Sequence, residues 1–258
     1  MLLPRIIPSL LISNDELVKT INFKNPAYIG DPINTSKIFS EFEADELLIF
    51  DISASANNMS PNLELLEKIA KQCRMPVCYG GGIKSVKQSV DIVNLGIEKI
   101  ALSSILFEDI NIIQKLNEKI GSQSVVGVLD VKVNANGNYS ILTDNGKKLI
   151  DKDPVKICEE LQQFGIGEII INCIDGDGTK NGINLNLLSY FSQYISVPIT
   201  IMGGLSSIEE IEKIVEKYGV IGIGVGSLFV YKGQFNAVLI NYPSKDEKRK
   251  IFKKYLQL

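Results

Sequence analysis

Two similar stretches, PVCYGGGIKS (76–85) and PITIMGGLSS (198–207), decide the expected fold. Each is a short apolar run that ends in glycines and leads into a serine of the kind that begins a helix. The shift along the chain that superimposes their glycine pairs also superimposes Glu46 of ELLIFD on Glu168 of EIIINC. The chain therefore contains an internal repeat of roughly half its length.

Eight β-branched runs alternate with longer segments of helical periodicity, which is typical of βαβ units in a parallel sheet. The runs are RIIPSL, ELLIFDI, PVCYGG, IEKIALS, VVGVLDV, EIIINCI, PITIMGG and VIGIGVG. Two equal four-strand halves predict one closed (βα)8 TIM barrel, a single domain over residues 1–258. A doubly wound open sheet would also alternate, but it would not explain the equal halves.

Three stretches depart from this rhythm. The first strand is expected to end at Leu10 and Leu11 and to run straight into a polar loop that reaches residue 20. Residues 131–148, which contain Asn-Gly turns, predict a hairpin inserted after the fifth strand. The tail at 244–258 reads as a charged amphipathic helix with a solvated face.

Composition excludes several classes of function. A net charge of −3 and a pI near 5.3 give no basic surface for nucleic acid. No apolar run approaches the roughly 20 residues that span a bilayer, and the N-terminus lacks a signal-peptide pattern, so we expect a cytoplasmic protein with no membrane partner. The chain has no histidine, which excludes Ser-His-Asp and Cys-His catalysis, and neither a metal site nor an organic cofactor is indicated.

The glycine clusters at Gly82 and Gly204 follow strands and precede helices, where backbone N–H groups can bind an anion. ALSS (101–104) and GVGS (224–227) end the neighbouring strands with small and hydroxyl residues. Each half therefore offers two adjacent loops, and we expect a ligand with an anionic group at each end. The alternative is that these small residues only close the barrel rim.

Acidic residues at the expected strand ends are candidates for acid–base chemistry. They are Asp51, Asp130, Asp175 and Asp177. Asp130 is the best candidate because it follows the apolar VVGVL, where desolvation can raise its pKa. It could instead be a loop cap or pair with Lys132. Its counterpart in the first half is Leu11.

Charged residues gather at the starts of four strands. They are Arg5, Glu46, Lys99 and Glu168. Residues at this end of a barrel normally contribute to stability rather than to chemistry. The four could form a structural ion-pair ring, or a gate on a central passage.

Over nearly its whole length the chain resembles the cyclase subunit of imidazole glycerol phosphate synthase, HisF. The resemblance rests on RII, LVKTINF, GDP, DELLIFDISAS, YGGGI, GSQSVV, VLDVK and GEIIINCIDGDGTKNG. It implies a (βα)8 barrel of lyase or cyclase type that binds a bisphosphorylated substrate across its mouth. It also implies ammonia delivery through the barrel from a glutaminase (HisH-type) subunit.

The resemblance also implies roles for individual positions. One phosphate would be held by Gly82, Ser103 and Ser104, and the other by Asp177, Gly178, Gly204, Gly226 and Ser227. Asp130 would be one of two catalytic carboxylates, with Lys19 beside them. The ring of Arg5, Glu46, Lys99 and Glu168 matches the ammonia gate.

One departure is chemical. The cyclases carry their second carboxylate at the position of Leu11, and leucine cannot transfer a proton. IIPSLLI, YIGDPIN and GSLFVYKGQFNAVLINYP resemble HisF paralogues of bacterial surface-polysaccharide (lipopolysaccharide) pathways. Those are implied to work with a glutaminase and a separate sugar amidotransferase on an acetamidino sugar. A histidine-biosynthesis cyclase, a non-catalytic ammonia conduit or scaffold, and a sugar-phosphate isomerase remain alternatives.

Overall fold

A computed structural model describes residues 3–253 of the chain. Eight parallel strands form a closed ring, because β12 pairs with β1 and β10 pairs with β7. In order around the barrel they are β1 (Arg5–Ser13), β4 (Leu47–Asp51), β5 (Val77–Gly80), β6 (Lys99–Leu102), β7 (Val125–Val133), β10 (Glu168–Cys173), β11 (Ile199–Met202) and β12 (Gly222–Val225). These are the eight runs of the sequence, and the predicted (βα)8 barrel is confirmed.

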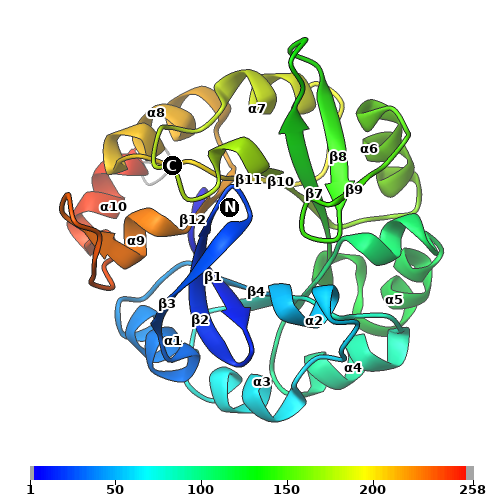
Figure 1. Ribbon diagram of the computed structural model, residues 1–258, viewed down its shortest axis with the longest axis horizontal. Helices are drawn as coiled ribbons and strands as arrows, with labels where there is room; N and C mark the ends of the chain where they lie inside the picture. The colour runs from blue at the N-terminus through cyan, green and yellow to red at the C-terminus, as the bar shows by residue number, and fades with distance from the viewer. Residues whose placement is uncertain (1–2, 254–258) are drawn as a thin grey trace.

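Each strand leads to a helix on the outside of the barrel, and the helices surround the strands in Figure 1. They are α1 (Pro32–Glu41), α3 (Leu63–Ala70), α4 (Val86–Asn94), α5 (Ile112–Ile120), α6 (Pro154–Gln163), α7 (Leu185–Phe191), α8 (Ile208–Tyr218) and α10 (Lys245–Ile251). Side-chain caps fix where several begin: Asn62 accepts a hydrogen bond from the Leu65 N–H, and Asp153 caps α6 just before a proline.

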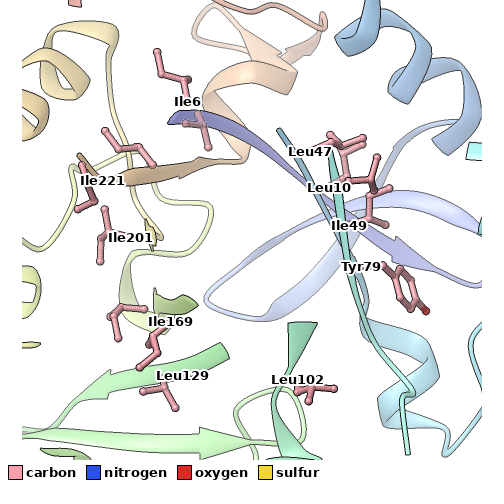
Figure 2. Packing of buried hydrophobic residues seen from close by; sticks show 14 of the residues in the cluster. Ile6, Leu10, Leu47, Ile49, Tyr79, Leu102, Leu129, Ile169, Ile201 and Ile221 are labelled. Carbon is pink, nitrogen blue, oxygen red and sulfur yellow. The ribbon is translucent and has the colours of Figure 1, made fainter. Parts of the chain in front are cut away.

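Strand alternation divides the buried residues into two cores. Residues such as Ile6, Leu47 and Ile49 point outward against the helices, as Figure 2 shows. A smaller inner cluster fills the middle of the barrel; it consists of Ile7, Leu48, Cys78, Ala101, Val126, Val128, Ile170 and Met202. Burying one large apolar side chain contributes about 1.5–3 kcal/mol. Because the middle of the barrel is apolar, its polar groups collect at the two ends.

The residues after the first strand form a ribbon, so the expectation of a polar loop there is wrong. β1 continues to Ser13 and pairs antiparallel with β2 (Glu16–Ile21), which pairs with β3 (Lys24–Gly30). Asn14 and Asp15 adopt positive φ values of 51° and 64° at the tight turn, a conformation that Asn and Asp tolerate. Leu17 and Val18 of β2 are then buried, whereas a solvated loop would leave them exposed.

The hairpin predicted after Asp130 is confirmed. β7 extends to Val133 and pairs antiparallel with β8 (Tyr139–Thr143), which pairs with β9 (Lys148–Leu149). In Figure 1 this hairpin rises from the rim of the barrel.

The remaining elements are short. They are α2 (Ile52–Ala56), α9 (Ser227–Val230), the 3-10 turns η1 (Ser104–Phe107), η2 (Ser122–Ser124) and η3 (Ile174–Gly176), and the ribbon of β13 (Tyr231–Lys232) and β14 (Ala237–Val238). In the tail, Ser244 and Glu247 form a capping box at the start of α10, and residues 254–258 of the expected tail helix lie outside the described residues. Across residues 3–253 no helix has the length and apolar character needed to cross a bilayer.

Candidate functional site

A cavity of about 340 Å³ opens at the carboxyl ends of the barrel strands. Its walls come from both halves of the barrel and from the β2–β3 ribbon. They include all ten residues for which the sequence predicts catalysis or phosphate binding, namely Lys19, Gly82, Ser103, Ser104, Asp130, Asp177, Gly178, Gly204, Gly226 and Ser227. The fold thus brings these residues together in one place; their individual roles stay predictions.

Asp130 lies near the end of β7 beside Asn172 of β10. The Asn172 amide donates a hydrogen bond from Nδ2 to Asp130 Oδ1 at 2.7 Å. Burial raises the pKa of Asp130 to about 7, the Asn172 hydrogen bond opposes that rise, and the negative charge of Asp177 adds to it. A carboxyl group with this pKa can both donate and accept a proton near neutral pH.

The first half of the barrel has no such pair. Leu11 of β1 is paired with Phe50 of β4, and Phe50 is related by the sequence repeat to Asn172. Leu11 therefore occupies the position that Asp130 occupies in the second half. Both Leu11 and Phe50 line the cavity. One wall of the mouth is apolar where the opposite wall carries a carboxyl and an amide.

Lys19 reaches the cavity from β2, where it is buried. Its Nζ donates a hydrogen bond to the Ser9 carbonyl oxygen at 2.6 Å. Burial lowers the pKa of Lys19 to about 8, against the opposing effect of the Asp177 charge. Gly226 leaves room for this side chain, because a Cβ there would lie 2.8 Å from Lys19 Nζ. Lys19 is a second group in the cavity that can exchange a proton near neutral pH.

The two expected anion cradles have matching backbone conformations. Ser103 (φ −127°, ψ −90°) and Gly226 (φ −95°, ψ −96°) hold equivalent turns at the ends of β6 and β12, and each precedes a short helical turn. Gly82 and Gly204 have φ values of +66° and +105° and approach backbone oxygens so closely that a Cβ would lie 2.6 and 2.5 Å from them. These glycines are required by the backbone itself.

The Asp177 side chain ties the β2–β3 ribbon to the loop after β10. Its Oδ2 accepts hydrogen bonds from the Thr20 hydroxyl at 2.6 Å and from the Phe23 N–H at 3.1 Å. A Cβ at Gly178 would lie 2.0 Å from the Thr20 carbonyl oxygen. The ribbon therefore sits tightly on this loop, and Thr20 holds the neighbouring Lys19 over the cavity.

The two other acidic candidates have structural partners. Asp51 caps α2 by accepting hydrogen bonds from the N–H groups of Ser53 and Ala54. Asp175 accepts a hydrogen bond from the Val133 N–H at 2.7 Å and so braces the inserted hairpin. These contacts engage Oδ1 of Asp51 and Oδ2 of Asp175, so one oxygen of each carboxylate has a structural partner.

The four predicted gate residues lie at the opposite end of the barrel as a closed ion-pair ring. Arg5 pairs with Glu46 and Glu168, and Lys99 Nζ lies 2.9 Å from an oxygen of each glutamate. Burial opposes ionisation of Glu168, but Arg5 and Lys99 outweigh it and hold the pKa of that carboxyl below its usual value. Thr200, which sequence reasoning missed, donates a hydrogen bond to Glu168 Oε1 at 2.5 Å.

Phe50, Asn172 and Asp144 are among the residues of the mouth that escaped the sequence analysis. The repeat relates Phe50 to Asn172, and each directly precedes the last residue of its strand, so the sequence could have indicated both. Asp144 carries no local signal, because it reaches the cavity only when the inserted hairpin folds back over the rim.

Comparisons with known proteins place these features in context. The family model described as "Histidine biosynthesis protein" matches residues 5–236. The chain is 47% identical over 251 residues to the "Putative imidazole glycerol phosphate synthase subunit hisF3" of Vibrio vulnificus, covering 97% of this chain and 96% of that protein. It is 44% identical to the "Putative imidazole glycerol phosphate synthase subunit HisF" of Leptospira interrogans, covering 98% and 100%. Identity to the "Imidazole glycerol phosphate synthase subunit HisF" of Streptococcus sanguinis is 35%, covering 90% and 92%.

Proposed function

The chain belongs to the HisF family of imidazole glycerol phosphate synthase subunits, and from that premise we propose that it uses ammonia from a glutaminase partner to support acetamidino modification of a bacterial surface sugar. In this proposal the barrel receives ammonia at the end that carries the ion-pair ring. A separate sugar amidotransferase completes the reaction by placing the ammonia nitrogen on the acetamido carbon, while the amide C–O bond breaks and the oxygen leaves as water.

The observation that carries the proposal is the pairing of Leu11 with Phe50 at the mouth. Closing an imidazole ring requires proton transfers on two sides of the substrate. Asp130 is available on one side, but the equivalent position on the other side is a hydrocarbon. A barrel that hands ammonia onward does not need the second acid.

The other end of the barrel supports an ammonia route. The ring of Arg5, Glu46, Lys99 and Glu168 closes the strand starts, and the small residues Ala101 and Gly224 line the cavity at the other end of the barrel. Lys99 carries a compact ammonium group on a flexible four-carbon chain, whereas Arg5 holds both glutamates through a planar guanidinium group. Movement of Lys99 would therefore open the network at the least structural cost.

The test is a glutaminase assay. The purified chain is mixed with a HisH-type glutaminase, and glutamate release is measured with and without the chain. We expect stimulation of about tenfold or more, and Lys99→Ala should change the transfer of ammonia to product while the complex still forms. Complex formation without any stimulation of glutamine hydrolysis contradicts the proposal.

A histidine-pathway cyclase is the second candidate, favoured by Asp130 and Lys19 in one cavity with two cradles. Wild type, Leu11→Asp and Asp130→Asn are assayed with ammonium salt and the bisphosphorylated ribulosyl carboxamide ribotide. Turnover by the wild type that Asp130→Asn abolishes supports the cyclase. Turnover only in Leu11→Asp supports a barrel that has lost ring closure with its second acid.

A further inference from the structure

The two ends of the cavity differ in charge, and we propose that they select different chemical groups: a phosphate at the second-half end and an uncharged sugar hydroxyl at the first-half end. Asp144 is the residue that makes this selection. The inference rests on the proposed function and narrows its ligand to a sugar monophosphate rather than a bisphosphate.

At the first-half end, a carboxylate occupies the cradle that the sequence assigns to phosphate. The Ser104 hydroxyl donates a hydrogen bond to Asp144 Oδ1 at 3.1 Å. The Ser104 hydroxyl proton is thereby used, and the negative charge of Asp144 faces the position that an anion would take. A second carboxylate, Glu108, also lines this end of the cavity.

Asp144 is held in this position by its neighbours in the chain. It lies in the β8–β9 turn, where Asp144 and Asn145 have φ values of 54° and 56°. Asn145 Nδ2 donates a hydrogen bond to the Ile52 carbonyl oxygen at 2.9 Å, which fastens the turn across the rim. A Cβ at Gly146 would lie 3.3 Å from the ring of Phe23, so the turn also contacts the β2–β3 ribbon.

One cation, Lys84, lines this end beside the carboxylates of Asp144 and Glu108, so the sum of these three charges is negative. Lys84 donates hydrogen bonds to both the carbonyl and the side-chain oxygen of Asn58, on the rim of the cavity. Carboxylate oxygens accept hydrogen bonds from hydroxyl groups but repel a phosphate dianion. Phe50, in the same wall, offers an aromatic face for the C–H groups of a sugar ring.

The second-half end has the opposite character. The Asp177 carboxylate, which lines this end, accepts hydrogen bonds from the Thr20 hydroxyl and the Phe23 N–H. Lys180 lines the cavity, and its Nζ is anchored 2.6 Å from Asn236 Oδ1. With Gly204, Gly226 and Ser227 around it, this end keeps the backbone N–H groups and the positive charge that a phosphate requires.

Binding is measured by calorimetry with three probes: inorganic phosphate, ribose 5-phosphate and fructose 1,6-bisphosphate. For the wild type we expect one bound phosphate per chain and no gain in affinity from the second phosphate of the bisphosphate. Asp144→Asn keeps an acceptor for Ser104 but removes the charge, so bisphosphate affinity should rise about tenfold. Asp151→Asn, an exposed carboxyl beyond β9, is the matched control and should bind like the wild type. Lys180→Ala should weaken ribose 5-phosphate binding about tenfold.

Two results would overturn the inference. One is wild-type binding of the bisphosphate at least tenfold tighter than of ribose 5-phosphate, with no further gain in Asp144→Asn. The other is the absence of phosphate binding by both the wild type and Asp144→Asn. Either result would overturn this inference without changing stimulation of the glutaminase. If that stimulation is absent but the chain still binds one phosphate and gains nothing from a second, the proposed function alone is refuted. Asp144 is exposed, so Asp144→Asn should keep the wild-type melting temperature, which confirms folding.

Discussion

Asn172 Nδ2 lies 2.7 Å from Asp130 Oδ1, across the β7–β10 pair, while the Asn172 Oδ1 atom is buried without a hydrogen-bond partner among the described residues. The amide thus supports the charged form of Asp130 on one side. On the other side its Oδ1 atom is a buried hydrogen-bond acceptor that is shielded from solvent. An unpaired buried acceptor costs about 1–3 kcal/mol, and a donor on a bound ligand would recover it.

Replacing Asn172 tests this pairing. In Asn172→Ala the pKa of Asp130 should rise above its value of about 7, because the hydrogen bond that favours the carboxylate is lost. The pKa is read from the carboxyl ¹³C shift of labelled aspartate as a function of pH. Asn94→Ala, at an exposed site on α4, is the control. An unchanged or lowered pKa would show that Asn172 does not act on Asp130.

Lys19 should cost stability while serving the site. Its pKa is about 8 in the folded protein and 10.5 in the unfolded chain, so folding disfavours the charged form. This penalty is complete below pH 8 and disappears as pH rises from 8 to 10.5. Lys19→Met should therefore be more stable than the wild type at pH 7, by up to about 3 kcal/mol, and the advantage should vanish near pH 10.5.

Urea unfolding at pH 7 and pH 10 measures this difference, and ligand binding by Lys19→Met should fall at the same time. Lys213→Met, on the exposed side of α8, is the control. A variant less stable than the wild type at both pH values would mean that the bond to the Ser9 carbonyl outweighs desolvation of the ammonium group.

The ion-pair ring should be intolerant of losing one member. Glu168→Gln leaves Arg5 and Lys99 with one glutamate between them, and an uncompensated buried charge costs about 3–5 kcal/mol. The pKa of Glu168 lies below its usual value, so its stabilisation is present above pH 4.5 and lost as pH falls further. Unfolding free energies at pH 4 and pH 7 should differ less in Glu168→Gln than in the wild type.

Glu118→Gln, at an exposed position on α5, should leave both values unchanged. A loss below about 1 kcal/mol in Glu168→Gln would mean that water screens the ring and that its geometry contributes little to stability.

The β2–β3 ribbon should loosen when its tie to Asp177 is cut. Thr20→Val removes the hydroxyl that lies 2.6 Å from Asp177 Oδ2 but keeps the side-chain shape. Hydrogen exchange of residues 16–30 should become about ten- to a hundredfold faster, since one hydrogen bond to a charged group contributes about 1.5–3 kcal/mol. Amides of α8 in the same sample are the internal reference, and unchanged exchange of residues 16–30 would contradict a tie through Thr20.

The sequence by itself determined the barrel, because the signals that specify it are local and repeated. Alternation of β-branched runs with amphipathic helices, and glycines at the ends of β5 and β11, follow from the φ and ψ preferences and side-chain periods of neighbouring residues. The repeat relates Glu46 to Glu168 without any knowledge of contacts, so both ends of the barrel could be assigned before the structure. Even the presence of a leucine at position 11, in place of an acid, is evident from the sequence alone.

Tertiary structure decided which side chains face one another. Strand register places Asn172 beside Asp130 and Phe50 beside Leu11, and register is specified by the burial of whole strands. Residues 12–20 carry polar residues that read as a loop, but they form part of a ribbon in which the middle of β2 is buried and Lys19 lines the cavity. Asp144 meets Ser104 only because a hairpin folds across the rim, 40 residues along the chain from its partner. Such contacts depend on where distant segments meet, and no local preference encodes that.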